Sequence, residues 1–182
     1  MNYSKDLIDF LNVSPVNFHA VKEVARRLDN AGYKYLSAEE KLGEVKAGDK
    51  FYVTKNDSSI YAFQIGKQTL GEAGFHIICA HSDSPTFRIK PNAEMICERG
   101  MTKLNTEVYG GPIMSTWFDR PLSIAGRVII KTDDVMHPET RLLKVERPVL
   151  LIPNLAIHFN RQVNDGVKLE SSMTNWKRAI CS

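Results

Sequence analysis

Apolar and polar positions alternate with a helical period near the start of the chain. The first predicted helix has an apolar stripe formed by Leu7, Phe10, Leu11 and Ile8. Ser4 is the expected N-cap, because a serine side chain there accepts a hydrogen bond from a free backbone N–H. Ser14-Pro15 is expected to interrupt this helix, since the residue before a proline avoids the α region.

A second amphipathic helix is predicted after the proline. Its apolar face consists of Phe18, Val21, Val24, Ala25 and Leu28. The opposite face carries the charged residues Lys22, Glu23, Arg26 and Arg27. Gly32 is expected to end the helix, because glycine readily adopts the left-handed conformation of a helix C-terminus.

The period changes from helix to strand at about residue 49. Residues 51–53 and 60–65 have strand-like composition on either side of a polar turn at residues 55–58, which predicts a β-hairpin. Residues 86–90 alternate cleanly between apolar and polar side chains, and Pro91 is expected to end that strand. With the two helices, this pattern predicts an α/β fold.

A short apolar run, residues 75–80, ends in a cluster of polar side chains. Gly74 precedes the run and Pro85 follows the cluster, which predicts a strand buried on both faces, with Cys79 inside it. His81 and Asp83 would then lie at the rim of a sheet, where open α/β folds bind ligands. The His-x-Asp spacing allows the carboxylate to accept a hydrogen bond from one imidazole nitrogen, and this orients a metal-binding histidine. A histidine that is merely hydrogen-bonded at a strand end is the alternative.

From residue 95 onward the pattern consists of strands and turns. Strands are expected at residues 105–109, 122–131, 141–145 and 149–152. This change of pattern suggests a domain boundary near residue 95. After Lys168 the sequence LESSMTNWKRAICS has no clear period, so residues 169–182 are assigned to a tail.

Composition excludes several classes of partner. The net charge of +3, without a basic run containing aromatic residues, does not indicate nucleic-acid binding. No stretch approaches the roughly 18 apolar residues that a membrane span needs, so no membrane association is expected. The three cysteines are widely separated and form no CxxC pair, which favours a reducing, cytoplasmic environment.

Several motifs, in order along the chain, resemble one enzyme family. They are SPVNFHAV (residues 14–21), AHSDSP (80–85), YGG (109–111), STWFDR (115–120), AGRV (125–128) and RP with IPNLAIH (147–158). Together they resemble the M18 metallo-aminopeptidases, the aspartyl aminopeptidases, over about residues 5–168. The motif Trp117-Phe118-Asp119-Arg120 is interpreted as an aromatic corner held by an Asp-Arg pair rather than as a substrate clamp.

The resemblance implies a peptidase with two zinc ions per site that removes N-terminal Asp or Glu from peptides. The implied fold is an α/β, zinc-exopeptidase-like domain with an inserted, mostly β dimerisation domain. Residues 1–95 would belong to the first domain and residues 96–168 to the insertion, and both would be incomplete. The implied assembly is a homo-oligomer built from dimers, commonly a dodecamer.

The resemblance also assigns roles to three residues. His81 is implied to be a zinc ligand, and Asp83 is implied to be a catalytic residue that accepts a hydrogen bond from His81. His158 matches a second histidine, which either ligates metal or reaches the active site of a neighbouring subunit. The second role, polarising the carbonyl of the scissile bond, is favoured.

The sequence departs from the family in lacking the family's remaining metal ligands and its general-base glutamate. We therefore expect a truncated chain that is inactive by itself, because a catalytic zinc needs about three protein ligands. The alternative is a non-catalytic remnant that keeps only an oligomerisation surface. Side-chain preference, oligomer number and the choice between zinc, manganese and cobalt stay open.

Overall fold

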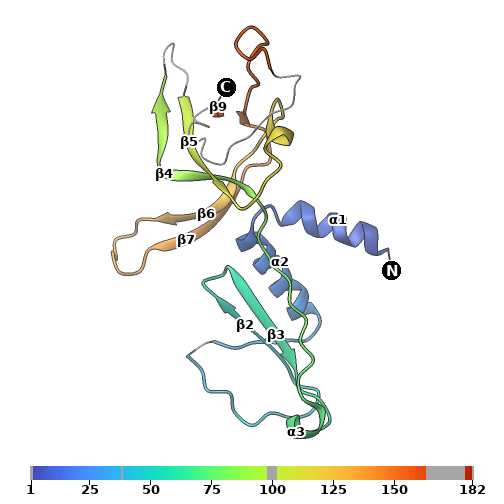
Figure 1. Ribbon diagram of the computed structural model, residues 1–182. Coiled ribbons are helices and arrows are strands. Elements are labelled where there is room, and N and C mark those ends of the chain that lie inside the picture. The colour runs from blue at the N-terminus through green and yellow to red at the C-terminus, as the bar shows by residue number, and fades with distance from the viewer. Residues whose placement is uncertain (1, 38, 98–101, 163–178, 182) are drawn as a thin grey trace. The chain divides into compact units, whose positions relative to one another are not determined.

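The computed structural model describes residues 2–37, 39–97, 102–162 and 179–181 (Figure 1). The chain divides into two compact units, one of residues 1–83 with 125–144, the other of residues 84–124 with 145–182. Both contain small sheets, and the first also contains the helices α1 and α2, so the α/β class is confirmed. The domain limits predicted at residues 95 and 168, and the inserted dimerisation domain, stay predictions. None of the helices in the described ranges has the length and apolarity needed to cross a bilayer.

Two helices open the first unit, α1 (Tyr3–Val13) and α2 (Asn17–Asn30), and Ser14-Pro15 separates them as predicted. The N-cap of α1 is Asn2, whose side chain accepts a hydrogen bond from the Lys5 N–H at 3.1 Å. The prediction of Ser4 as N-cap was wrong. Asn and Ser cap equally well, so the helix begins at the earlier of the two suitable residues.

Helix α2 has the amphipathic character that its sequence predicts. Of the predicted apolar positions, Val21 is buried and the other four are half-buried, and Ala20, which was not predicted, is buried as well. Gly32 follows the helix with φ of +80°, a conformation that favours glycine and ends the helix as expected. Arg27 pairs with Asp6 of α1 at 2.9 Å, so the polar face of α2 also holds the two helices together.

The predicted hairpin is confirmed as β2 (Lys50–Lys55) and β3 (Ser59–Gln64), which pair antiparallel with Phe51 opposite Phe63. Asn56 and Asp57 have φ of +52° and +53°, the left-handed conformation that a tight hairpin turn requires. β1 (Lys34–Tyr35) pairs parallel with β2 and completes a three-stranded sheet.

The core of the first unit lies between α2 and this sheet. Helix α2 contacts β2 and β3, and Val21 of α2 and Tyr52 of β2 are both buried. The Tyr52 hydroxyl donates a hydrogen bond to Asp29 of α2 at 2.9 Å. Burial, followed by this bond, raises the pKa of Tyr52. The hairpin is therefore held to the helix by both apolar and polar contacts.

The predicted buried strand at residues 75–80 is absent. After the short helix α3 (Leu70–Ala73), residues 74–85 form neither helix nor strand, and Phe75 and Ile78 are 73% and 99% exposed. Cys79 is also exposed, so its expected burial was wrong. The prediction failed because an apolar run becomes a buried strand only where neighbouring strands and covering layers are present. Among the described residues, none pairs with this run.

The first unit also contains a second hairpin, formed by β6 (Ala125–Ile130) and β7 (Glu139–Lys144). These strands lie within or overlap the ranges predicted from the sequence. Arg127 of β6 lies over the ring of Phe18 in α2 at 4.3 Å, and it donates a hydrogen bond to the Asn56 carbonyl at 2.8 Å. Through Arg127, the second hairpin contacts both α2 and the turn of the first hairpin.

The second unit contains a sheet with strand order β4-β5-β9-β8. Its strands are β4 (Thr86–Ile96), β5 (Thr102–Tyr109), β8 (Leu150–Leu151) and β9 (Ala179–Cys181). Strand β9 is the described part of the segment assigned to the tail, and the rest of that segment lies outside the described residues.

Pro91 does not end β4, contrary to the prediction. The pairing of β4 with β5 is interrupted between Ile89 and Glu94, so the missing N–H of Pro91 falls where no ladder bond is made. β4 is also an edge strand of the sheet, the usual place for a proline within a strand.

Candidate metal-binding corner

His81 and Asp83 lie close together at the end of the exposed segment. His81 Nδ1 is 2.8 Å from the backbone oxygen of Asp83 and 3.3 Å from its carboxylate oxygen Oδ1. Since a backbone carbonyl can only accept, the shorter contact requires Nδ1 to carry the proton. The expected pairing of the two residues is present, although the nearer acceptor is the backbone carbonyl rather than the carboxylate.

This arrangement leaves the other ring nitrogen suited to bind a metal. In a neutral imidazole protonated at Nδ1, Nε2 carries the lone pair. The His81 side chain is 82% exposed, and its Nε2 makes no hydrogen bond to the described residues. An imidazole oriented through its other nitrogen is typical of metal-binding histidines. His81 therefore fits the role of one zinc ligand.

Ser82, which lies between His81 and Asp83, anchors this motif to the first hairpin. Ser82 Oγ donates a hydrogen bond to the backbone carbonyl of Ser58 at 3.2 Å. Ser58 immediately precedes β3 and follows the turn at Asn56 and Asp57. The hairpin that the sequence predicts therefore positions the motif that carries the candidate ligand.

Three or more potential ligands do not gather in the described ranges. Among the His, Cys, Asp and Glu side chains of the described ranges, no group of three could hold a metal ion. A catalytic zinc is bound by about three protein ligands. Within the described ranges, His81 and Asp83 do not make up a complete metal site, and their part in metal binding stays a prediction.

His158 lies in an exposed turn of the second unit. Residues 157–159 form the turn, and the Phe159 N–H donates to the Ala156 carbonyl at 2.8 Å. His81 and Asp83 belong to the first unit. The metal-binding and substrate-contacting roles of His158 both stay predictions.

Asp119 positions the chain that leads to His158, a role that the sequence analysis missed. Its carboxylate accepts hydrogen bonds from the Asn154 backbone N–H at 3.0 Å and from the Asn154 side-chain amide at 2.7 Å. These bonds, the backbone one first, lower the pKa of Asp119. The Asp119 N–H also donates to the Ile152 carbonyl at 2.9 Å. The described ion pairs do not include the expected Asp119–Arg120 pair.

The expected aromatic corner is present next to Asp119. Trp117, at the end of the 3-10 helix η2 (Met114–Trp117), packs edge-to-face against Phe87 of β4 with ring centroids 5.1 Å apart. Asp119 itself has φ of +53°, an uncommon conformation for a residue other than glycine. No sequence signal identified Asn154 as its partner, because the two residues are 35 positions apart.

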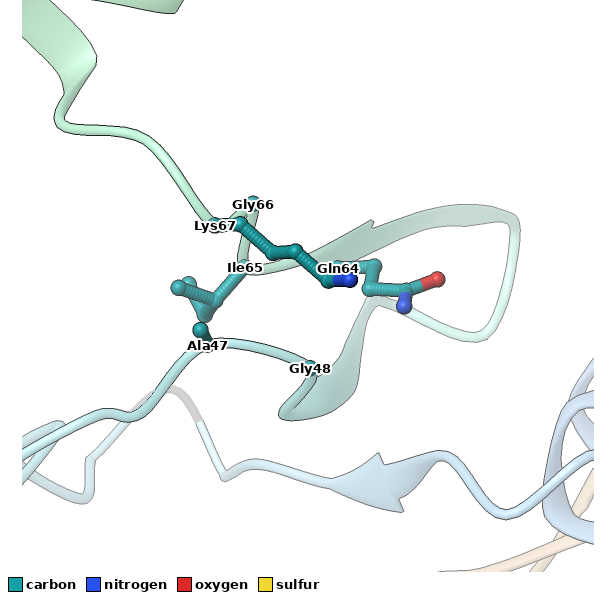
Figure 2. Close-up of a pocket in the computed structure, with 6 residues that line it drawn as sticks. All are labelled: Ala47, Gly48, Gln64, Ile65, Gly66 and Lys67. Carbon is teal, nitrogen blue, oxygen red and sulfur yellow. The ribbon is translucent and has the colours of Figure 1, made fainter.

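A shallow pocket of about 350 Å³ lies elsewhere in the first unit, between the loop before β2 and the end of β3 (Figure 2). It is lined by Ala47, Gly48, Gln64, Ile65, Gly66 and Lys67. None of these side chains is a carboxylate, imidazole or thiolate. The pocket therefore lacks the chemistry of a catalytic metal site.

Comparison with known sequences reveals extended similarity to one family. Residues 10–177 match the family described as aminopeptidase I zinc metalloprotease (M18), and the match runs into the segment assigned to the tail. "Probable M18 family aminopeptidase 2" of Clostridium novyi is 50% identical over 169 residues, which are 93% of this chain and 39% of that protein. The protein of the same name from Clostridium acetobutylicum is 52% identical with the same coverage. The chain thus spans about two fifths of the length of these relatives.

Solved structures show the same similarity. A chain in the cryo-EM structure of the Ape4 and Nbr1 complex has a TM-score of 0.85 and 37% identity, and the match covers 97% of this chain and 33% of that one. The S. cerevisiae mApe1 dodecamer gives a TM-score of 0.79 and 28% identity, with coverage of 99% and 38%. An M18 aminopeptidase of Thermotoga maritima gives 0.75 and 25%, with coverage of 98% and 38%.

Proposed function

The chain belongs to the M18 family of zinc metallopeptidases, and on that premise we propose that it forms part of a zinc-dependent aminopeptidase. The proposed reaction is hydrolytic removal of an N-terminal residue, preferably Asp or Glu, from a peptide. The observation that carries the proposal is the orientation of His81 by Asp83, which leaves Nε2 available as a ligand.

Each of the three candidate residues has a proposed part in this reaction. His81 would hold a zinc ion through Nε2, and its Nδ1–H is bonded to the Asp83 carbonyl. The Asp83 carboxylate, 3.3 Å from Nδ1, makes the imidazole a stronger donor. The chemistry that zinc would supply there, with two ions per site in this proposal, is a lower pKa of a bound water and polarisation of the scissile carbonyl. His158 contributes a hydrogen bond to that carbonyl in a neighbouring subunit.

The 182 residues by themselves are proposed to be inactive, because His81 and Asp83 offer too few ligands. Homologous proteins include the mApe1 dodecamer, which supports a homo-oligomer as the active assembly. The cytoplasm is proposed as its location because the cysteines are widely separated and form no CxxC pair. The purified chain, supplied with zinc and a peptide with N-terminal aspartate, should release no aspartate. Zinc-dependent release of aspartate would contradict this part of the proposal.

The site assignment can be tested in a chimera that completes the relative. In this chimera, residues 10–177 replace the matching segment of the Clostridium acetobutylicum protein. We expect zinc-dependent release of N-terminal aspartate, and His81→Ala should abolish both zinc retention and activity. His137→Ala is the matched control, because His137 is an 83% exposed histidine of the same unit, in the turn between β6 and β7. Equal effects of the two substitutions would contradict the role of His81.

The same chimera separates the roles of Asp83 and His158. Asp83→Asn retains the backbone acceptor, so we expect zinc affinity to fall by roughly 10-fold, the lower end for such partners. His158→Ala should lower kcat while zinc content stays unchanged. Loss of zinc in His158→Ala would instead make His158 a metal ligand. A chimera that assembles into oligomers without zinc or activity would support the alternative of a non-catalytic remnant.

A further inference from the structure

His19, in the first turn of α2, has a ring nitrogen that is buried without a partner. No group among the described residues forms a hydrogen bond with its Nδ1. His19 belongs to the motif SPVNFHAV, residues 14–21, which has no part in the proposed reaction. Since buried polar atoms are nearly always hydrogen-bonded, an unpartnered one calls for a physical explanation.

The hairpin of β6 and β7 is attached to the two helices close to His19. Lys144, the last residue of β7, donates a hydrogen bond from Nζ to the Asn12 carbonyl of α1 at 2.9 Å. Arg127 of β6 lies over the ring of Phe18, the residue before His19. These contacts join both strands of the hairpin to the region where α1 ends and α2 begins.

The charges near His19 disfavour its protonated form. Burial first, and then the positive charges of Lys22 and Lys144, lower the pKa of His19 below the ordinary value of 6.5. His19 also lies at a helix N-terminus, where the free N–H groups disfavour a cation. Neutral imidazole is therefore the form that is compatible with the attached hairpin.

Carboxylates of the described elements around α2 do not offset these charges, because each has another partner. In α1, α2 and β7, Asp6 and Asp9 pair with Arg27 and Lys5, Glu23 with Arg26 and Arg27, Asp29 with Tyr52, and Glu139 with Arg141. The strands β1 to β3, which also contact α2, carry lysines but no acidic residue. A protonated His19 would therefore find no free counter-ion on these elements.

Protonation of His19 would make the contact with the hairpin unfavourable, because imidazolium carries an N–H on both ring nitrogens. The Nδ1–H would be a buried donor without an acceptor, and the charged ring would lie near Lys22 and Lys144. Since the folded pKa lies below the ordinary one, the stabilisation is complete above pH 6.5 and is lost as the pH falls through the folded pKa.

We propose that His19 is a pH-sensitive switch, which keeps the β6–β7 hairpin on the helices while it is neutral and releases the hairpin when it is protonated. Release exposes the ring to water and moves the Lys144 charge away, which removes both penalties. Release also breaks the hydrogen bond from Arg127 to the Asn56 carbonyl, in the turn of the first hairpin. The switch requires neither zinc nor a peptide substrate.

The switch can be tested by NMR on the 182-residue chain, from about pH 8 to about pH 4. The chemical shifts of the His19 ring report its protonation, and nuclear Overhauser effects between Phe18 and Arg127 report the hairpin contact. We expect these Overhauser effects to disappear in step with protonation of His19. Those between Phe51 and Phe63, whose ring centroids are 5.6 Å apart, should persist as an internal reference.

Several results would overturn the proposal. They are a Phe18–Arg127 contact that survives protonation of His19, loss of that contact while His19 is neutral, and a His19 that stays neutral over the whole pH range. Simultaneous loss of the reference Overhauser effects would show unfolding of the whole unit instead of release, and would overturn it too. Because the measurement contains no zinc and no peptide, its result is independent of the proposed aminopeptidase activity.

Two substitutions make the test specific. His19→Gln is uncharged at every pH, so the Phe18–Arg127 contact should persist down to about pH 4. Lys22→Gln removes a charge that opposes protonation, so loss of the contact should move to higher pH. Lys22 is exposed, and its substitution keeps the test available if His19→Gln does not fold. An unchanged pH dependence in either folded variant would overturn the proposal.

Each substitution has a matched control in the same unit. His137→Gln replaces an 83% exposed histidine between β6 and β7, which pairs with Asp134. Lys41→Gln replaces an exposed lysine that has no part in lowering the pKa of His19. Both controls should lose the Phe18–Arg127 contact at the same pH as the unchanged chain. A His137→Gln variant without pH dependence would make His137 the titrating group and overturn the role of His19.

Discussion

Strand β2 (Lys50–Lys55) and the segment Phe75–Ala80 are both apolar runs of the first unit, and they differ completely in their surroundings. Phe51 of β2 is 8% exposed and paired opposite Phe63, with the two ring centroids 5.6 Å apart. Phe75 is 73% exposed, and its segment makes no backbone pair with the described residues. Composition alone does not separate the two runs.

The two runs differ in which secondary-structure elements lie close to them in the sequence. β2 meets β3 across a turn of a few residues, and α2 precedes both. Local pairing of this kind carries a low loop-closure cost. Phe75–Ala80 follows a short helix, and the described residues offer it no neighbouring hairpin strand. An apolar pattern therefore specifies a strand only together with the partners that cover it.

Two matched substitutions should show the largest contrast between the runs. Phe51→Ala should lower the free energy of unfolding by about 3 kcal/mol, because it removes a buried aromatic side chain. Phe75→Ala should change it by less than about 0.5 kcal/mol, as expected for an exposed residue. Urea unfolding followed by circular dichroism measures both values. Similar losses at the two positions would contradict the contrast in burial.

A smaller effect is expected from the polar contact beneath β2. Tyr52→Phe removes the hydrogen bond to Asp29 and should cost about 1 kcal/mol. Tyr61→Phe is the control, because Tyr61 of β3 is 53% exposed and its hydroxyl has no hydrogen-bond partner in the described ranges. The same urea measurement applies, and an equal cost for both substitutions would exclude a specific contribution from Asp29.

The smallest effect concerns acid stability of α2, the helix that covers β2. Hydrogen bonds from Arg26 and then Arg27 lower the pKa of Glu23 from 4.5 to about 2. Since the folded pKa lies below the ordinary one, the stabilisation is complete above pH 4.5 and is lost as the pH falls toward 2. The effect should be modest, because Arg26 is 60% exposed and solvent screens the pair.

The free energy of unfolding, measured from about pH 6 to about pH 2 in the unchanged chain and in Glu23→Gln, tests this pH dependence. The substitution should flatten the fall in stability with acid, and Glu40→Gln, at an exposed position outside the described ion pairs, should not. An unchanged pH profile in Glu23→Gln would exclude Glu23 as the source.

In the candidate site, too, the contact between residues close together in the sequence was predicted, and the contact between distant residues was not. The His81–Asp83 contact spans two residues, so the sequence predicted the pair directly, although not the carbonyl as the nearer acceptor. The Asp119–Asn154 contact spans 35 residues, and the sequence analysis assigned Asp119 to its neighbour Arg120 instead. Partners far apart in the chain leave no periodic signal.

The sequence by itself determined the helices α1 and α2, the first hairpin, the pairing of His81 with Asp83 and the family. The helices and the hairpin depend on residue patterns over short spans, and the family was identified from several motifs that follow one another in the family's order. The tertiary structure alone decided that Pro91 lies in a gap of the β4–β5 pairing and that Asp119 accepts from Asn154. It also decided that Phe75–Ala80 is exposed. Burial depends on which other segments cover a residue, and the apolar pattern of its own segment does not identify them.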